Sequence, residues 1–179
     1  MVIDTLGNLE SLKPKLVNSE ISFTGNFIRN LAFDNSGKLW IGTNNGIFVY
    51  DPESNEMELF SLPFSENQNK EIWEIYLDDE GFIWIGTYSS GAFLIDPKTR
   101  LVETIVLDSS IDRTETVRSI SKGFFGEFWI GTRGGLFVYS KSRGVTGYFR
   151  HETREPRSIS NNSIPVSYTH LTLPTNREV

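Results

Sequence analysis

Short apolar runs recur along the chain at a regular spacing, and residues typical of turns separate them. Leu39-Trp40-Ile41-Gly42-Thr43 returns as Ile83-Trp84-Ile85-Gly86-Thr87 and again as Phe128-Trp129-Ile130-Gly131-Thr132, so the tryptophans lie 44 and then 45 residues apart. A glycine precedes each of these runs, and a second glycine with another apolar run follows it. A period near 45 residues that contains only short apolar runs and turns predicts the four-stranded blades of a β-propeller.

Each repeat divides into four predicted strands. The first strands are residues 28–33, 72–77 and 117–121, the second carry the tryptophans, the third follow the second glycine, and the fourth are residues 57–61, 101–107 and 147–150. Apolar residues follow one another directly in these runs instead of alternating with polar ones. This pattern is expected of a sheet that is covered on both faces, as a blade is by its two neighbours.

The predicted turns agree with this division. An aspartate and a glycine bound the loop between the first two strands at 34–37 and at 78–81. The aspartate can accept from the backbone two residues on, and the glycine can adopt the positive φ that closes the turn. An Asp-Pro pair ends the third strand of these two repeats, because proline has no N–H for the ladder. The third repeat departs from the pattern, with Gly123 in place of the turn aspartate and Ser140-Lys141 in place of Asp-Pro.

We therefore expect an all-β fold, a partial β-propeller of about three complete four-stranded blades with pieces of two more. The propeller fragment is expected to span residues 1–165, with complete blades near 28–61, 72–107 and 117–150 and partial blades at 1–16 and 158–165. Propellers close their ring with about four to eight blades, so the segment needs the remaining blades of a full-length protein as partners. Its terminal blades should expose apolar faces and strand edges, which predicts association when the segment is alone.

Residues 166–179 break the repeat abruptly. The stretch Val166-Ser167-Tyr168-Thr169-His170-Leu171-Thr172-Leu173-Pro174-Thr175 resembles the translated adapter of a sequencing library, and the alternative is a divergent strand and loop. We expect this tail to be adapter read-through, not native protein, and to pack against nothing. Such segments are excluded from fold reasoning.

Composition and charge exclude several classes of function. The 179 residues carry a net charge of −6 and no basic stripe, which argues against a nucleic-acid partner. Cysteine is absent, so thiolate metal sites and cysteine nucleophiles are excluded, and we expect no metal and no cofactor. No apolar run reaches the roughly 18 residues of a membrane span, and no signal peptide is visible. We expect no direct membrane contact in this segment.

At the level of these repeats the chain resembles the two-component regulator propeller family, whose pattern is a strand ending in Asp, a Gly turn, Leu-Trp-Ile-Gly-Thr, then Gly-Leu and an apolar run. Residues 28–164 follow this pattern, with Gly-Leu itself only at Gly135-Leu136. In that family, tandem propellers form the periplasmic sensor of a hybrid histidine kinase and recognise a carbohydrate fragment. The resemblance implies a periplasmic, non-catalytic, ligand-sensing segment of such a sensor, with an oligosaccharide as ligand. Kinase activity would belong to parts outside this chain, and the full-length protein could be a homodimer.

Candidate ligand-binding residues lie where the loops of one face are expected to meet. The loops from strand two to strand three, and from strand four to the next strand one, emerge on the same face, around the central channel. Amide, aromatic and guanidinium groups suited to polyhydroxyl ligands occur there, although they are also common in any exposed loop. They are Asn44, Asn45, Tyr88, Ser89 and Arg133 in the loops, with Arg29, Trp73 and Arg118 near the strand starts.

Other interpretations compete with this one. Trp40, Trp84 and Trp129 could stack on a sugar, but their position within the second strands favours packing between blades. The aspartate-rich turns lack the spaced carboxylates of a calcium loop, which favours plain hairpins. A propeller lyase or hydrolase would need a set such as a histidine with a carboxylate, yet His151 is the one histidine outside the tail and falls in a charged stretch that we interpret as a solvated linker. A protein-interaction scaffold without a small ligand is the third alternative.

Overall fold

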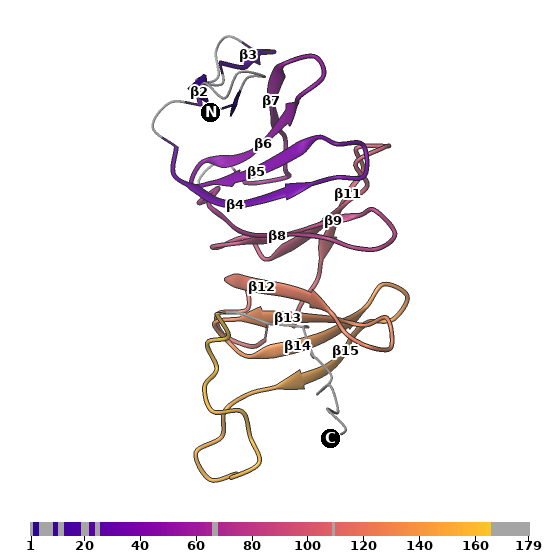
Figure 1. The fold of residues 1–179 in the computed structure, drawn as a ribbon. Helices are drawn as coiled ribbons and strands as arrows, with labels where there is room; N and C mark the ends of the chain where they lie inside the picture. Colours follow the sequence, from indigo (N-terminus) through magenta and orange to yellow (C-terminus); the bar gives the residue numbers. More distant parts are fainter. Residues whose placement is uncertain are drawn as a thin grey trace, which may run out of the picture.

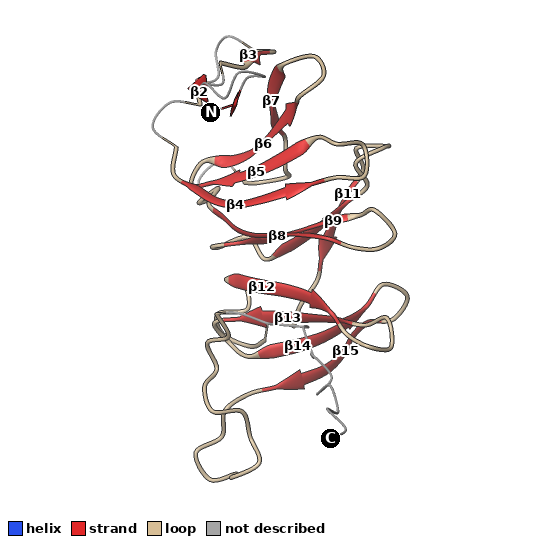
Figure 2. Cartoon of the chain, in the orientation of Figure 1, coloured by secondary structure: helices blue, strands red, loops and turns tan. Residues whose placement is uncertain are grey.

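The computed structural model is all-β, with three sheets of four or five strands and one two-stranded pair. It describes residues 2–3, 9–10, 13–18, 22–23, 26–65, 68–108 and 110–165, and the predicted adapter tail at 166–179 lies outside these residues. The sheets follow one another along the chain, from the N-terminal sheet at one end to the C-terminal sheet at the other (Figures 1 and 2). In this described part, no helix has the length and apolarity that crossing a membrane requires.

The first complete sheet contains β4 (Ile28–Phe33), β5 (Leu39–Thr43), β6 (Gly46–Asp51) and β7 (Glu56–Phe60), each antiparallel to the next. A fifth strand that the sequence did not predict, β3 (Lys15–Leu16), pairs in parallel with β7. The short strands β1 (Val2–Ile3) and β2 (Leu9–Glu10) pair with each other in the segment expected to belong to an earlier blade.

The second and third sheets repeat the same antiparallel order. The second contains β8 (Ile72–Leu77), β9 (Ile83–Thr87), β10 (Ala92–Ile95) and β11 (Val102–Ile105). The third contains β12 (Val117–Lys122), β13 (Phe128–Thr132), β14 (Leu136–Ser140) and β15 (Gly144–Phe149). The first strands β4, β8 and β12 lie side by side at the inner edge of the array. The chain is thus an open, partial β-propeller, as the sequence predicts.

The fourth strands differ from their predicted bounds. β11 stops at Ile105, two residues before the predicted end, and β15 begins at Gly144, three residues before the predicted start. A bulge between Val138 and Tyr139 shifts the register, so that pairing continues to Ser140 opposite Gly144. The apolar pattern does not show such a bulge, because the inserted residue only changes the pairing partner.

The tryptophan of the repeat is tied to the aspartate of the preceding turn. The side chains of Trp40 and Trp84, which are 2% and 0% exposed, each donate from Nε1 to the Oδ2 of Asp34 and Asp78 at 2.9 Å. The other carboxylate oxygen accepts from backbone N–H groups of the same turn. Burial disfavours ionisation of both aspartates, but the Ser36 hydroxyl at Asp34, the Lys141 ammonium at Asp78 and these hydrogen bonds hold the pKa of each below its ordinary value. The motif therefore joins strand two to the hairpin before it.

Glu127 replaces the missing aspartate in the third repeat. Its carboxylate accepts from Trp129 Nε1 at 3.1 Å and from the backbone N–H of Phe125 at 3.0 Å. A Cβ placed on Gly123 would lie 2.1 Å from Glu127 Oε1. The carboxylate thus occupies the space that the aspartate side chain fills in the other blades, which explains why the third repeat needs a glycine there.

The glycine of the repeat lies where one blade meets the next. A Cβ on Gly42 would lie 2.9 Å from Ile72, and a Cβ on Gly86 would lie 2.9 Å from Val117, both residues being the first of the next inner strand. Gly131 has the same relation to Ile164, at 2.8 Å, and Ile164 N–H donates to the carbonyl of Thr132 at 3.0 Å. Ile164 therefore occupies the position at which a further inner strand would start. The threonine of each repeat closes the next turn, with its hydroxyl bonded to a glycine carbonyl.

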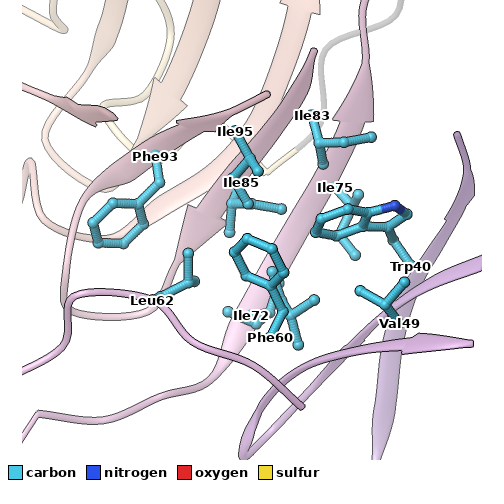
Figure 3. Close-up of a cluster of buried hydrophobic side chains, with 11 residues drawn as sticks. Trp40, Val49, Phe60, Leu62, Ile72, Ile75, Ile83, Ile85, Phe93 and Ile95 are labelled. Carbon is cyan, nitrogen blue, oxygen red and sulfur yellow. The ribbon is translucent and has the colours of Figure 1, made fainter. Parts of the chain in front are cut away.

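Apolar clusters fill the space between successive blades. Between the first two blades, Trp40 and Phe60 of one blade pack against isoleucines of the other, among them Ile72 and Ile85 (Figure 3). Between the second and third blades, the ring of Trp84 stacks on that of Phe128, with centroids 4.0 Å apart and planes at 28°. Full burial of an aromatic side chain contributes about 1.5–3 kcal/mol, so Trp40 and Trp84 act as packing residues between blades.

One apolar face of the first blade is covered only in part: Ile41, Phe48, Tyr50 and Met57 are buried against Leu16 and Phe23, but the inner strand is not covered. Phe27, Leu31 and Phe33 are 72%, 53% and 60% exposed, whereas Ala32, which alternates with the last two, packs against the cluster shared with the second blade. Adjacent residues of a strand point to opposite faces, so the uncovered side chains lie on the face away from the second blade. A preceding blade of the same kind would cover them.

Candidate functional site

Each inner strand contains a β-bulge at the same position. The register between the first and second strands of a blade shifts once, and the inserted residue is Arg29 in β4, Trp73 in β8 and Arg118 in β12. Bulges re-aim side chains and are common next to functional sites. Three of the residues predicted to bind a ligand therefore occupy equivalent positions on adjacent inner strands.

These three side chains contact one another, and we call them the rim stack. The guanidinium carbon of Arg118 lies 4.5 Å from the ring centroid of Trp73, and that of Arg29 lies 5.6 Å from it. The two cations come from the blades on either side of Trp73 and are attracted by its ring, as expected within about 6 Å. The ring of Tyr88, from the β9–β10 turn, lies 5.9 Å from Trp73 at an angle of 31°.

The two arginines of the rim stack have different electrostatic surroundings. Arg29 donates to the carboxylate of Glu71, just before β8, and forms an ion pair with it. For Arg118, no carboxylate partner occurs among the residues that the structure describes. The positive charge of Arg118 is therefore available to an acceptor from outside the chain.

Two side chains of the rim stack carry buried polar atoms without a protein partner. In the described ranges, such atoms include Trp73 Nε1 and Arg118 Nε, and also the hydroxyls of Ser119 and Ser90 in the neighbouring strand and turn. An unmet buried donor costs about 1–3 kcal/mol. Trp73 Nε1 and Arg118 Nε, on two side chains that contact each other, are donors suited to the oxygen atoms of a ligand.

The residue after the bulge in β8 is Glu74. Burial raises the pKa of Glu74 from 4.5 to about 7, and a hydrogen bond with the Asn30 side chain partly opposes this shift. Asn30 holds the equivalent position in β4, and Ser119 holds it in β12. The carboxyl is therefore partly protonated near neutral pH, and it joins the inner strands of the first two blades beside the rim stack.

A hollow of about 780 Å³ opens beside Arg118, and we call it the arginine hollow. Its walls come from the third blade and from the long segment that follows β15, drawn in yellow in Figure 1. The residues that line it are Ser110, Ile111, Asp112, Arg113, Arg118, Arg133, Gly134, Tyr148, Arg150, His151, Ser160, Asn161, Asn162 and Ser163. Four of them are arginines, which makes this wall strongly basic.

Internal hydrogen bonds fix the walls of the arginine hollow. The hydroxyl of Tyr148 donates to the carbonyl of Gly134 at 2.8 Å, and the backbone N–H of Arg133 donates to Thr116 at 3.1 Å. In the segment after β15, the N–H of His151 donates to Asn162 Oδ1 at 2.5 Å, and its ring Nδ1 lies 2.8 Å from the carbonyl of Ile159. This segment is a loop closed on itself, which places Arg150 and His151 at the hollow while both stay exposed, as expected of a solvated linker.

The remaining predicted residues lie in the turns that follow the second strands, and Ser89 directly follows Tyr88 of the cluster. Asn44 is exposed, and its Oδ1 accepts from the N–H of Phe27 at 2.6 Å, which ties the oxygen to the segment before β4. Asn45 is exposed, and the hydroxyl of Ser89 donates to the carbonyl of Asn69 at 3.4 Å. The structure thus brings together Arg29, Trp73, Arg118, Tyr88 and Arg133 of the predicted set. In the described ranges, no group of three or more histidine, aspartate or glutamate side chains is placed to hold a metal ion.

Three successive four-stranded blades with equivalent inner strands define the chain as a segment of a β-propeller. Residues 22–45 and 66–89 match the family model described as two component regulator propeller. These two segments are therefore similar to repeats of that family, and both fall on the repeats that keep the turn aspartate. Among curated proteins, none matches the chain significantly.

Solved structures share the fold. The extracellular domain of the proposed hybrid two-component system BT4673 from B. thetaiotaomicron superposes with a TM-score of 0.71 at 24% identity, over 80% of this chain and 19% of that one. The extracellular domain of a second proposed hybrid two-component system, BT3049, gives a TM-score of 0.58 at 29% identity, over 69% of this chain and 17% of that one. Virginiamycin B lyase from Staphylococcus aureus gives 0.54 at 14% identity, over 66% and 40%. The chain spans only about a fifth of the length of the two-component relatives.

Proposed function

We propose that the chain is the ligand-sensing propeller segment of a two-component signal transduction sensor and that its ligand is an oligosaccharide. The match to two component regulator propeller repeats supports the sensor role. The similarity to extracellular domains of hybrid two-component systems supports a periplasmic or extracellular location. Kinase and output functions would then belong to other parts of a larger protein, together with the blades that complete the ring.

The observation that carries the proposal is the set of unmet donors around the rim stack. Trp73 Nε1, Arg118 Nε and the Ser119 hydroxyl are buried without a protein partner. Hydroxyl and ring oxygens of a sugar can accept from all three. Guanidinium groups from both flanking blades already lie against the Trp73 ring, so we infer that a sugar binds through the indole N–H and the neighbouring donors.

A non-catalytic role fits the chemistry of the site better than an enzyme. Glu74 is the one buried carboxyl with a raised pKa near the rim stack among the described residues, and its known partner is an amide, Asn30. General acid–base catalysis usually pairs such a group with a second acid, base or nucleophile. The similarity to virginiamycin B lyase, at 14% identity, extends to the fold and supports no shared reaction.

A glycan array tests this proposal. The chain, fused to thioredoxin to limit association, is applied to immobilised plant, microbial and animal oligosaccharides. We expect binding to a narrow group of structures, and loss of that binding in Trp73→Leu. The matched control is Arg143→Gln, on the opposite face in the β14–β15 turn, which should bind as the parent does. Absence of binding to every glycan, or equal binding by Trp73→Leu, would overturn the proposal.

A further inference from the structure

We infer that the arginine hollow binds an oxyanion, so that the oligosaccharide is acidic and carries a sulfate ester or a uronate carboxylate. This inference rests on the proposed function and specifies its ligand. It arises from the distribution of charge around the hollow, which differs from that of the whole chain, where the net charge is −6.

The hollow contains more arginines than its carboxylates can neutralise. Arg113 lies 3.6 Å from the carboxylate of Asp112, and Arg150 lies 3.1 Å from that of Glu152. Arg118 and Arg133 have no carboxylate partner in the described part of the chain. Two arginines without a carboxylate partner therefore line the same hollow, and each can pair with an anion that enters it.

The two uncompensated arginines are placed on rigid elements. Arg118 lies in the bulge of β12, where the ring of Trp73 covers its guanidinium and its Nε is buried without a partner. Arg133 lies in the tight β13–β14 turn. Two hydrogen bonds hold this turn in place: the backbone N–H of Arg133 donates to the carbonyl of Thr116, and the Tyr148 hydroxyl donates to the carbonyl of Gly134. Guanidinium groups present paired N–H donors that match carboxylate and sulfate oxygens.

The size of the hollow suits a small part of a saccharide. Its volume of about 780 Å³ falls in the range of roughly 300–1,000 Å³ that is common for ligand pockets. Hydroxyl and amide groups of Ser160 and Asn161 line it beside the arginines and can bond to sugar hydroxyls. Because Arg118 belongs to both the hollow and the rim stack, one ligand can place its anion in the hollow and a neighbouring sugar ring at Trp73.

Titration with defined oligosaccharides tests the inference. The probes are a heparin-derived hexasaccharide, hexagalacturonic acid and neutral maltohexaose, with sodium sulfate as the anion alone, added to the thioredoxin-fused chain. We expect one of the two acidic hexasaccharides to bind at least about tenfold more tightly than the neutral one, with an affinity that falls as salt is raised. Which acidic probe binds distinguishes a sulfate from a carboxylate.

Two variants locate the anion. Arg133→Gln should weaken binding of the acidic probe about tenfold or more, the usual effect of losing a charge-assisted pair of hydrogen bonds. Glu152→Gln should strengthen it several-fold, because it removes the carboxylate that competes for Arg150. Arg143→Gln, an arginine on the opposite face, should leave it unchanged. The Glu152 variant keeps the test decisive if Arg133→Gln perturbs folding.

The outcomes separate this inference from the proposed function. Tight binding of a neutral oligosaccharide that needs Trp73 but is indifferent to Arg133 would overturn the inference and leave the sensor proposal standing. Binding of sulfate alone, with no oligosaccharide bound, would show an anion site and overturn the saccharide ligand. Acidic binding that is unchanged in both Arg133→Gln and Glu152→Gln would place the anion elsewhere and contradict the inference.

Discussion

Replacing the turn aspartates of the first two repeats should reveal how strongly one blade supports the next. Asp34 and Asp78 share most contacts within their own blades, because each accepts from a buried tryptophan and from two turn amides. Asp34 also accepts from the Ser36 hydroxyl at 2.6 Å, whereas Asp78 has a partner in the third blade, Lys141, which lies 2.7 Å from its Oδ2. The two positions therefore differ in one contact within the turn and in one contact between blades, and Ser36→Ala removes the first difference.

The magnitude follows from the burial of these groups. Asp78 is 3% exposed and Asp34 is 7% exposed. Loss of a buried carboxylate and its hydrogen bonds costs about 3 kcal/mol, which we expect for Asp34→Ala. Asp78→Ala also removes the nearer of the two carboxylates that pair with Lys141 and leaves Glu80 at 3.3 Å, and breaking a buried pair raises the cost to at most about 5 kcal/mol.

Amide hydrogen exchange of β8, β9 and β10, on the fused chain at low micromolar concentration, measures the free energy of opening. In a double-mutant cycle, Lys141→Met should recover about 2 kcal/mol in the Asp78→Ala background and nothing in the Asp34→Ala background. Equal costs for the two aspartates, with no coupling between residues 78 and 141, would refute the reasoning that this ion pair joins the second blade to the third.

Three further predictions concern other parts of the molecule. Burial raises the pKa of Glu74 to about 7, so the contribution of Glu74 to the free energy of unfolding is complete below pH 4.5, decreases as pH rises to about 7 and then levels off. Glu74→Gln should abolish this decrease, which is at most about 3 kcal/mol. A pH profile of urea unfolding that is the same in the variant and the parent would contradict the prediction. Gly123→Asp should destabilise the third blade, because the new Cβ meets the Glu127 carboxylate. The double variant Gly123→Asp with Glu127→Lys restores the residues of the first blade and should recover the stability. The melting temperatures of the two variants check this, and a double variant no more stable than Gly123→Asp alone would count against the prediction. The chain without a fusion partner should associate as its concentration rises, and Leu31→Lys with Phe33→Lys should reduce this in sedimentation velocity; a monodisperse parent chain that melts cooperatively would contradict the prediction.

The fold was predictable from the sequence because each feature of the repeat has a local physical cause. The tryptophan donates a hydrogen bond to the turn aspartate, the glycine leaves room for the first residue of the next blade, and the threonine hydroxyl donates to a carbonyl of the turn that follows it. These causes act over a few residues or between neighbouring blades, so they recur with the period of the blade. Spacing alone therefore predicts the strands, including the first strands of the first two blades.

The sequence pattern could not show the features that depend on register. β3 pairs with β7 across about 40 residues of chain, and its two residues are too few to produce an apolar pattern. The compensation by Glu127 was also hidden, because the missing aspartate and its replacement stand on opposite sides of the turn. The first feature arises from a contact between distant segments, whereas the second is a local contact between residues two positions apart.

The candidate site was predicted in part. Arg29, Trp73 and Arg118 were identified from their place near the strand starts, and the structure brings them together through a bulge that the three blades share. Asn44 and Asn45 were chosen, like Tyr88 and Arg133, for their place in the loop after the second strand, and the structure leaves them in an exposed turn. The arginine hollow could not be predicted, because it depends on how the segment after β15 folds back. The charged residues of that segment, including Arg150, are exposed as we expected, but their charge pattern does not show that they line a hollow.

The indole N–H resonances of the four tryptophans offer the most direct test of ligand binding at the rim stack. The indole N–H groups of Trp40, Trp84 and Trp129 donate to carboxylates within the fold, whereas the indole N–H group of Trp73 has no protein partner. In ¹⁵N-correlated NMR spectra of the fused chain, an oligosaccharide selected on the glycan array should shift the Trp73 resonance and leave the other three in place. A bound oligosaccharide that leaves Trp73 unmoved, or that shifts the other tryptophans instead, would contradict the account.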